Sequence, residues 1–233
     1  MLSFMGIGAQ KCGTTWLYHW LSRHPLVAFP LGKEVHFWDR RDTRSIESYL
    51  GAFSGDRVEG DITPAYGFQP PETIAEVRAL LPALRLVYLY RNPIERAWSH
   101  ARMDLRVAGG TVGSTPDSWF IGHFNGTDSL LRGDYLTCIR NWRDAYDGQL
   151  LVLPTEDLSR DARTALTRCC NHIGISAEAY AAISDDELAA PIFRGDDVPL
   201  RPSLYPVLHA LYCEKISRLS DYLGADLSGW LQA

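Results

Sequence analysis

The sequence lacks several features that would assign it to a specialised class of protein. No apolar run approaches the roughly 20 residues of a membrane span, and the N-terminus lacks the basic-then-apolar profile of a secretory signal peptide. The net charge of −5 argues against a surface that coats nucleic acid. From these absences we expect a cytoplasmic protein with no membrane span and no nucleic-acid partner.

Cysteine and histidine show no pattern that is typical of a metal site. The five cysteines form neither a C-x-x-C motif nor a Cys/His spacing, and their odd number argues against a disulfide framework. The seven histidines are scattered along the chain. We therefore expect buried free thiols and no bound metal. The cysteines are Cys12, Cys138, Cys169, Cys170 and Cys213.

The sequence does contain enough apolar residues for one sizeable core. Its 233 residues are 46% hydrophobic, and no stretch has the composition of a linker, so we expect a single domain over residues 1–233. Strand and helix patterns alternate along the chain, and the apolar run at 84–90 is typical of a central parallel strand. This alternation predicts an α/β fold with a central parallel sheet flanked by helices.

The periodicity also predicts where most elements lie. An extended segment is expected at 33–38, with Glu34 and His36 pointing to the same side. The glycine-rich stretch 109–126 is expected to be a flexible lid that offers Trp119, Phe120 and Phe124 to an acceptor. Further strands are expected at 24–29, 58–61 and 150–153, helices at 16–23, 45–53, 72–81, 158–172 and 203–223 and in the later part of 130–146, and a long loop at 185–202.

Residues 4–17 are expected to form a buried strand, a tight loop and a helix, an arrangement that binds anions. Gly8 and Gly13 can take the dihedral angles that turn backbone N–H groups inward, and a helix from Thr14 adds the positive end of its dipole. The spacing fits the nucleotide-binding P-loop G-x-x-x-x-G-K-[ST], except that Thr14 stands in place of the lysine. Because its only cation is Lys11, the loop suits a donor with fewer phosphates and no metal.

A second anion-binding motif follows the central strand. Residues 91–99, R-N-P-I-E-R-A-W-S, place Arg91 at the carboxyl end of that strand, followed by a helix with Asn92 as its N-cap and Pro93 at its first position. Ser99 lies about two turns into this helix. The sequence therefore has two separate candidate anion sites.

Together the two motifs resemble those of sulfotransferases that use 3′-phosphoadenosine 5′-phosphosulfate (PAPS). The 5′-phosphosulfate loop of that family runs K-x-G-T-[TS]-[WF], as at 11–16, and its 3′-phosphate motif runs R-[ND]-P-x-[ED]-R-x-x-S, as at 91–99. The resemblance covers nearly the whole chain and is strongest to heparan sulfate N- and O-sulfotransferases and their bacterial relatives. Four further segments carry it: 33–39 (K-E-V-H-F-W-D), 63–66 (T-P-A-Y), 133–135 (G-D-Y) with Trp142, and 223–230 (L-G-A-D-L-S-G-W).

The resemblance implies a P-loop-like, three-layer enzyme that moves a sulfuryl group from PAPS to a hydroxyl or amine and releases 3′-phosphoadenosine 5′-phosphate (PAP). Glu34 resembles the catalytic carboxylate of this branch, and Lys11 would neutralise the leaving phosphate. His36 is either a partner of Glu34 or the base itself, and we expect Glu34 to be the base. The cofactor-binding residues are expected to be Lys11, Cys12, Gly13, Thr14, Thr15, Trp16, Arg91, Ser99, Tyr135, Arg194 and Gly195.

The acceptor stays open among small molecules, glycans, lipids and carrier-bound intermediates. Asp61-Ile62 stands where the branch often has E-K, and the cysteine pair near the adenine loop of the animal enzymes is absent, so the departures argue against a glycosaminoglycan. One alternative function is a P-loop nucleotide or metabolite kinase, which would need a Walker lysine and a Mg²⁺ ligand. Another is a nucleotide-binding regulatory module, favoured only if neither Glu34 nor His36 faced the cleft.

Overall fold

A computed structural model describes all residues of the chain except 42–43, 193–197 and 233. The chain divides into two compact units, each assembled from two stretches of sequence. The first unit comprises Met1–Tyr90 and Cys138–Phe193, and the second comprises Arg91–Thr137 and Arg194–Ala233. The expected single domain over residues 1–233 stays a prediction.

The first unit is built on a five-stranded sheet, in the order β2-β3-β1-β4-β5. Every neighbouring pair of strands is parallel, which confirms the predicted sheet. Because the strands are parallel, their carboxyl ends meet at one edge, where ligands of such folds bind. The strands are β1 (Leu2–Gly8), β2 (Val27–Ala28), β3 (Val58–Ile62), β4 (Arg85–Tyr90) and β5 (Leu150–Pro154).

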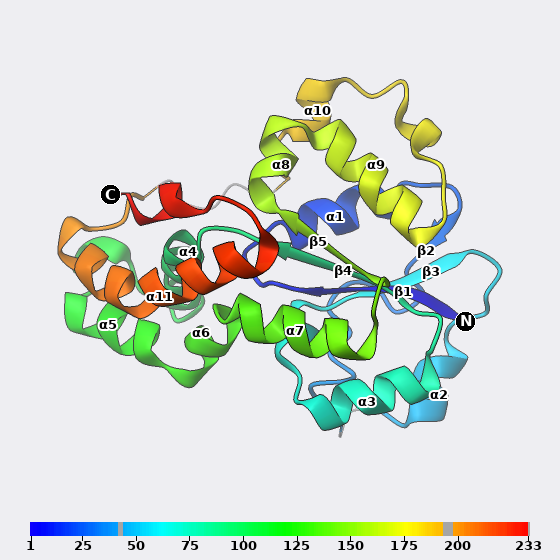
Figure 1. The fold of residues 1–233 in the computed structure, drawn as a ribbon, viewed down its shortest axis with the longest axis horizontal. Coiled ribbons are helices and arrows are strands. Elements are labelled where there is room, and N and C mark those ends of the chain that lie inside the picture. Colours follow the sequence, from blue (N-terminus) through cyan, green and yellow to red (C-terminus); the bar gives the residue numbers. More distant parts are fainter. Residues whose placement is uncertain (42–43, 193–197, 233) are drawn as a thin grey trace. The chain divides into compact units, whose positions relative to one another are not determined.

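Helices cover both faces of this sheet, so the predicted α/β architecture is confirmed (Figure 1). Helices α1, α8 and α9 lie on one face and α3 on the other. The bounds of the helices of this unit are α1 (Thr14–Leu21), α2 (Ile46–Gly51), α3 (Pro71–Leu80), α8 (Thr155–Arg160), α9 (Ala162–Ile173) and α10 (Asp185–Ala189), with short 3₁₀ turns η1 (Pro64–Phe68) and η3 (Ala177–Tyr180), and α7 (Tyr135–Ala145) enters it at Cys138.

Burial on both faces explains the apolar central strands. Five of the six residues of β4 are buried, because helices pack on both sides of it. A polar side chain also serves this core: His172 of α9 places Nε2 2.9 Å from the carbonyl oxygen of Leu86 and 3.0 Å from that of Gln149. Burial lowers the pKa of His172. The neutral imidazole therefore donates one N–H to carbonyls at the sheet edge of β4 and β5.

The second unit is helical. Its long helix α4 (Pro93–Val107) begins as predicted, because the side chain of Asn92 accepts a hydrogen bond from the N–H of Ile94 at 3.0 Å. Arg96 of α4 is fully buried and donates to the carbonyl oxygen of Ser129 at 2.9 Å. The remaining elements are α5 (Asp117–Asn125), α6 (Thr127–Arg132) and α11 (Tyr205–Leu223), with 3₁₀ turns η2 (Val112–Ser114), η4 (Pro202–Leu204) and η5 (Ser228–Leu231).

The prediction of a flexible lid at 109–126 is wrong. Most of this stretch is η2 and α5, and Phe120 and Phe124 are fully buried, so they offer no surface to an acceptor. Their i, i+4 spacing places them on one face of a helix, and Arg201 covers Phe120, with its guanidinium carbon 5.0 Å from the ring centroid. Only Trp119 is substantially exposed among the three aromatic residues, at 36%.

Two other predictions have mixed outcomes. The expected long loop at 185–202 begins with α10, and its middle lies outside the described residues. All five cysteines are free as expected, although Cys213 is half-buried rather than buried. None of the helices that the structure describes combines the length and the apolar character needed to cross a membrane.

Candidate active site

The loop between β1 and α1 has the backbone geometry of an anion site. Gly13, the N-cap of α1, is left-handed with φ 94°, as glycine permits. Lys11 is also left-handed, with φ 68°, which a residue with a Cβ rarely adopts. Left-handed residues in a tight loop turn successive N–H groups toward one side, where the start of α1 adds its dipole.

Neighbouring elements of the same unit hold this loop. The N–H of Ala9 donates to the carbonyl oxygen of Leu89 at the end of β4, at 2.6 Å. The hydroxyl of Thr155, at the start of α8, donates to the carbonyl oxygen of Cys12 at 2.8 Å. The unusual backbone is therefore fixed by tertiary hydrogen bonds, before any ligand binds.

The predicted loop residues divide into those that face solvent and those that support the loop. Cys12 and Trp16 are buried, and the Trp16 indole donates to the carbonyl oxygen of Leu188 at 2.7 Å. Thr14 is buried at 5% exposure, whereas Thr15 is exposed. Cys12 and Trp16 thus position the loop, and their side chains are not available to a phosphate.

The segment 33–39 is not extended, so the predicted period-2 alternation is wrong. Glu34 and His36 both adopt left-handed conformations, with φ 59° and 57°. The two side chains nevertheless meet, because His36 Nε2 lies 4.0 Å from Glu34 Oε2. Residues other than glycine occupy this region at a cost of about 1–3 kcal/mol each and are concentrated at functional sites.

Hydrogen bonds from the end of β3 and from η1 impose this conformation. The N–H of Glu34 donates to the carbonyl oxygen of Ile62 at 3.0 Å, and the N–H of Phe37 donates to the hydroxyl of Tyr66 at 2.9 Å. Because β3 neighbours β1, this anchors Glu34 at the same edge of the sheet as the Lys11 loop. Local sequence patterns carry no information on these long-range partners.

Asp61 is the centre of a hydrogen-bond network that supports the segment 33–39. In the sequence it stood out only as a departure from the family motif. Its side chain is fully buried and accepts hydrogen bonds from Tyr49 and Tyr66, both at 2.9 Å, and from Thr63 at 2.7 Å. Burial raises the pKa of Asp61, and these three bonds oppose the rise. Thr63 in turn accepts from the N–H of His36 at 3.5 Å. A polar residue at a buried position of a predicted strand was the signal that could have identified it.

The side chains of the segment form a chain of charged and polar groups. His36 Nδ1 lies 2.8 Å from Asp39 Oδ2, and Lys33 is ion-paired with Glu34. Because a carboxylate only accepts, Nδ1 of His36 is the donor to Asp39, which leaves the lone pair of a neutral imidazole on Nε2, toward Glu34. Glu34 is 45% exposed and His36 24%, so both are accessible to a substrate.

The second unit carries the residues predicted for the 3′-phosphate. Arg91 directly follows the last residue of β4 and is ion-paired with Glu95 one turn later, with 26% of its side chain exposed. Ser99 is half-buried on α4. Arg194 and Gly195 lie outside the described residues.

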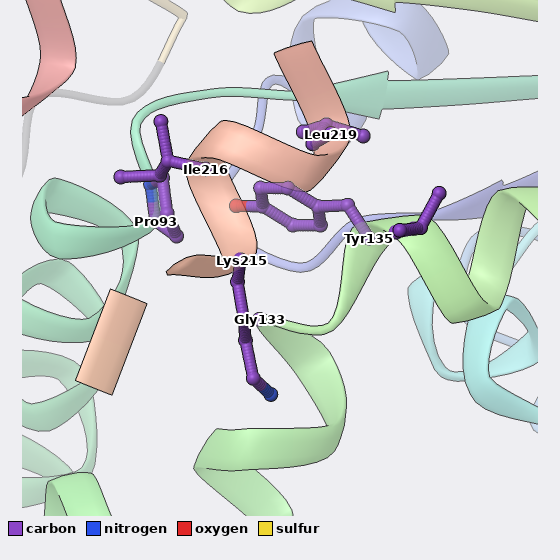
Figure 2. Close-up of a pocket in the computed structure, with 7 residues that line it drawn as sticks. Pro93, Gly133, Tyr135, Lys215, Ile216 and Leu219 are labelled. Atoms are coloured by element: carbon purple, nitrogen blue, oxygen red, sulfur yellow. The ribbon is translucent and has the colours of Figure 1, made fainter. Parts of the chain in front are cut away.

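Tyr135 lines a small pocket within the second unit, between the start of α4, the start of α7 and α11 (Figure 2). Its ring lies among apolar side chains and is only 2% exposed. Lys215 borders the same pocket, with Nζ 3.7 Å from Asp134 Oδ2. Packing therefore fixes the position of the Tyr135 ring, two residues after Gly133 in the G-x-Y motif.

Residues 4–187 match the family model described as the sulfotransferase domain. The chain belongs to the sulfotransferase family. The kinase alternative is not favoured. The loop has Thr14 in place of the Walker lysine, and the family model that matches is that of sulfotransferases.

Individual relatives agree with this membership. The chain is 35% identical over 97 residues to heparan sulfate glucosamine 3-O-sulfotransferase 6 of Mus musculus, which covers 40% of this chain and 28% of that protein. The solved sulfotransferase from Alicyclobacillus acidocaldarius matches with a TM-score of 0.74 at 23% identity, covering 100% of this chain and 99% of that one. Mouse SULT7A1, solved with PAP, matches with a TM-score of 0.62 at 16% identity over 94% of this chain and 85% of that one. The chain spans less than a third of the length of the curated relatives it matches.

The chain also contains a side-chain cluster that its sequence pattern did not reveal. His100 and Asp104 on α4 meet His123 of α5, although the histidines look scattered in the sequence. Burial and the charge of Arg96 lower the pKa of His100 to about 3. The i, i+4 spacing of His100 and Asp104 on a predicted helix was a signal for part of the cluster, but His123 lay in a stretch predicted to be a loop.

Proposed function

We propose that this protein transfers a sulfuryl group from PAPS to a hydroxyl or amine of an acceptor and releases PAP. The observation that carries the proposal is the loop after β1, a P-loop backbone whose only cation is Lys11 and whose Walker position is Thr14. Such a loop suits one phosphate with one sulfuryl group rather than a Mg²⁺-bound triphosphate. Two findings support this proposal: the chain belongs to the sulfotransferase family, and the similar mouse SULT7A1 was solved in complex with PAP.

The proposed cofactor roles follow from charge. Negative charge grows on the oxygen that bridges sulfur and the leaving 5′-phosphate, and Lys11 neutralises it together with the N–H groups of Gly13, Thr14 and Thr15. Arg91 and Ser99 bind the 3′-phosphate. The remaining residues proposed to bind or support the cofactor are Cys12, Trp16, Tyr135, Arg194 and Gly195.

Glu34 is the proposed general base. The acceptor must lose a proton as it attacks sulfur in line, and an exposed carboxylate on a fixed backbone can take it. Lys33 is ion-paired with Glu34 and so restrains the position of the carboxylate. Nε2 of His36 lies 4.0 Å from Glu34 Oε2, and it positions the carboxylate when it also carries a proton.

One observation favours a second candidate for the base. Asp39 holds Nδ1 of His36 at 2.8 Å, so the lone pair of Nε2 is presented toward the same place as Glu34. A carboxylate that orients an imidazole in this way is a common support for a base. The two candidates differ in which substitution abolishes the chemical step.

The acceptor is proposed to be a small molecule, glycan, lipid or carrier-bound intermediate. The names of several relatives specify heparan sulfate, so a glycan has support. Ile62 counts against a glycosaminoglycan, since it stands where the branch often has the lysine of E-K, which is used on sulfated glycans. We further propose that residues 1–233 form a single domain and that the protein is bacterial and cytoplasmic.

A mass-spectrometric screen for sulfate transfer from PAPS to a mixed acceptor library tests the reaction. Products heavier by one SO₃ group, together with formation of PAP, are expected. Calorimetry in EDTA tests the cofactor, because the charges of Lys11 and Arg91 replace a metal at the phosphates. Loss of PAP binding in EDTA, or tighter binding of ATP than of PAP, would contradict the proposal.

A further inference from the structure

The cluster on α4 and α5 brings three metal-binding side chains to one point within the second unit. One ligand atom from each of His100, Asp104 and His123 lies within 4.8 Å of the others. Asp104 Oδ2 is 2.9 Å from His123 Nε2 and 3.3 Å from His100 Nε2. The two imidazole rings are nearly perpendicular, at 72°, so their Nε2 atoms converge on the carboxylate from different directions.

The two separations from Asp104 are close to those between the ligands of a tetrahedral ion. Metal–ligand distances of about 2.0–2.1 Å place neighbouring ligand atoms about 3.3 Å apart in a tetrahedral zinc site. Asp128 at the start of α6 supplies a further oxygen, with Oδ2 3.8 Å from His100 Nε2. Its other oxygen is held by Arg132. A small rearrangement of side chains would therefore give two imidazoles and two carboxylates around one ion.

The surroundings fix the ligands and limit the kind of metal. His100 is 2% exposed, and His123 stacks on Trp119 with ring centroids 5.4 Å apart, so both imidazoles are held in place. Two cations, Arg96 and Arg132, also face His100 and offset the charge of the carboxylates. A hard ion such as Ca²⁺ or Mg²⁺, which depends on carboxylate charge and oxygen donors, is disfavoured, whereas imidazole donors suit first-row transition metals.

We infer that His100, Asp104 and His123 bind a divalent transition metal such as Zn²⁺, with Asp128 as the nearest additional ligand. These ligands are not among the residues proposed to bind PAPS, and the metal site does not depend on the proposed reaction. Its ligands come from two helices that are joined through η2, so the ion would fasten α5 to α4.

Metal binding to the full, untagged chain tests the inference. After treatment with EDTA and dialysis, titration with Zn²⁺ should show one site per chain and a rise in Tm. Co²⁺ should give the visible ligand-field absorption of a four-coordinate ion without a thiolate charge-transfer band, which separates this site from the free cysteines. Absence of a stoichiometric site for either ion would overturn the inference.

Variants assign the site to these residues. His123→Ala, on a partly exposed side chain, should weaken Zn²⁺ binding by at least about 100-fold, and Asp104→Asn by at least about 10-fold. His209→Ala removes a half-buried histidine of α11 outside the cluster and should leave the affinity unchanged. Circular dichroism confirms that each variant is folded. Equal affinity in wild type, His123→Ala and Asp104→Asn would show that the cluster is only a hydrogen-bonded group.

Discussion

Residues 33–39 in the first unit and 91–99 in the second carry equally clear motifs, but different interactions hold them. The first segment has two left-handed non-glycine residues, held by hydrogen bonds to β3 and η1 and by the buried Asp61 behind them. The second is a regular helix start with an Asn92 cap and an ion pair between Arg91 and Glu95, although Asn92 and Arg96 also donate to the carbonyl oxygens of Trp230 and Ser129. Geometry imposed by distant residues suits chemistry that needs exact placement, whereas a local helix start suffices to present a charge.

The largest expected effect tests the chemistry of the first segment. Glu34→Gln keeps the shape of the side chain but cannot accept a proton, so kcat should fall by about 10²–10⁴-fold while PAP affinity stays near wild type. His36→Ala should retain clearly more activity, because it removes only a positioning partner. Steady-state kinetics and PAP calorimetry measure both. An inactive His36→Ala together with an active Glu34→Gln would move the base to His36.

Asp61→Ala tests the support of that segment. Removing the buried carboxylate leaves three hydroxyl donors without their acceptor, so the free energy of unfolding should fall by about 2–4 kcal/mol in urea denaturation. Glu95→Ala, which breaks the exposed ion pair of the second segment, should change it by less than about 1 kcal/mol. Similar losses in the two variants would show that the segments are held alike.

Arg91→Ala tests the phosphate-binding role proposed for the second segment. A charge-assisted contact to a buried phosphate is worth about 1.5–3 kcal/mol, so PAP affinity should fall by about 10–150-fold. Affinity for 5′-AMP, which lacks the 3′-phosphate, should change far less, and stability should be nearly unchanged. Calorimetry with both ligands measures this. Equal losses for both ligands would refute the 3′-phosphate assignment.

The smallest expected effect is the pH dependence of the first unit. Burial lowers the pKa of His172 below its ordinary value of 6.5, so the unfolded chain binds this proton first as the pH falls. The stabilising contribution is complete above about pH 6.5 and is lost as the pH falls from there toward the folded pKa. Between about pH 7 and 5.5, the free energy of unfolding should therefore fall less in His172→Gln than in wild type. The difference should be at most about 1.4 kcal/mol per pH unit. Parallel stability curves for the two proteins would contradict this.

Sequence patterns alone predicted the parallel α/β fold, the positions of most strands and helices, the glycine cap at the start of α1 and the Asn92 cap. Each of these depends on interactions within a few residues or on burial of a periodic apolar face, which a sequence displays directly. The motifs also indicated which residues belong to the proposed site, because their spacing along the chain is itself the signal.

Three features depend instead on long-range contacts: the conformation of Glu34 and His36, the central place of Asp61 in its network, and the approach of His100 to His123. Alternation predicted an extended segment at 33–38, but hydrogen bonds to the distant residues Ile62 and Tyr66 outweigh the local preference. Likewise, α5 forms because Phe120 and Phe124 bury against the rest of their unit, despite the glycines around them. Contacts between residues distant in the chain decide such features, and no local pattern encodes their partners.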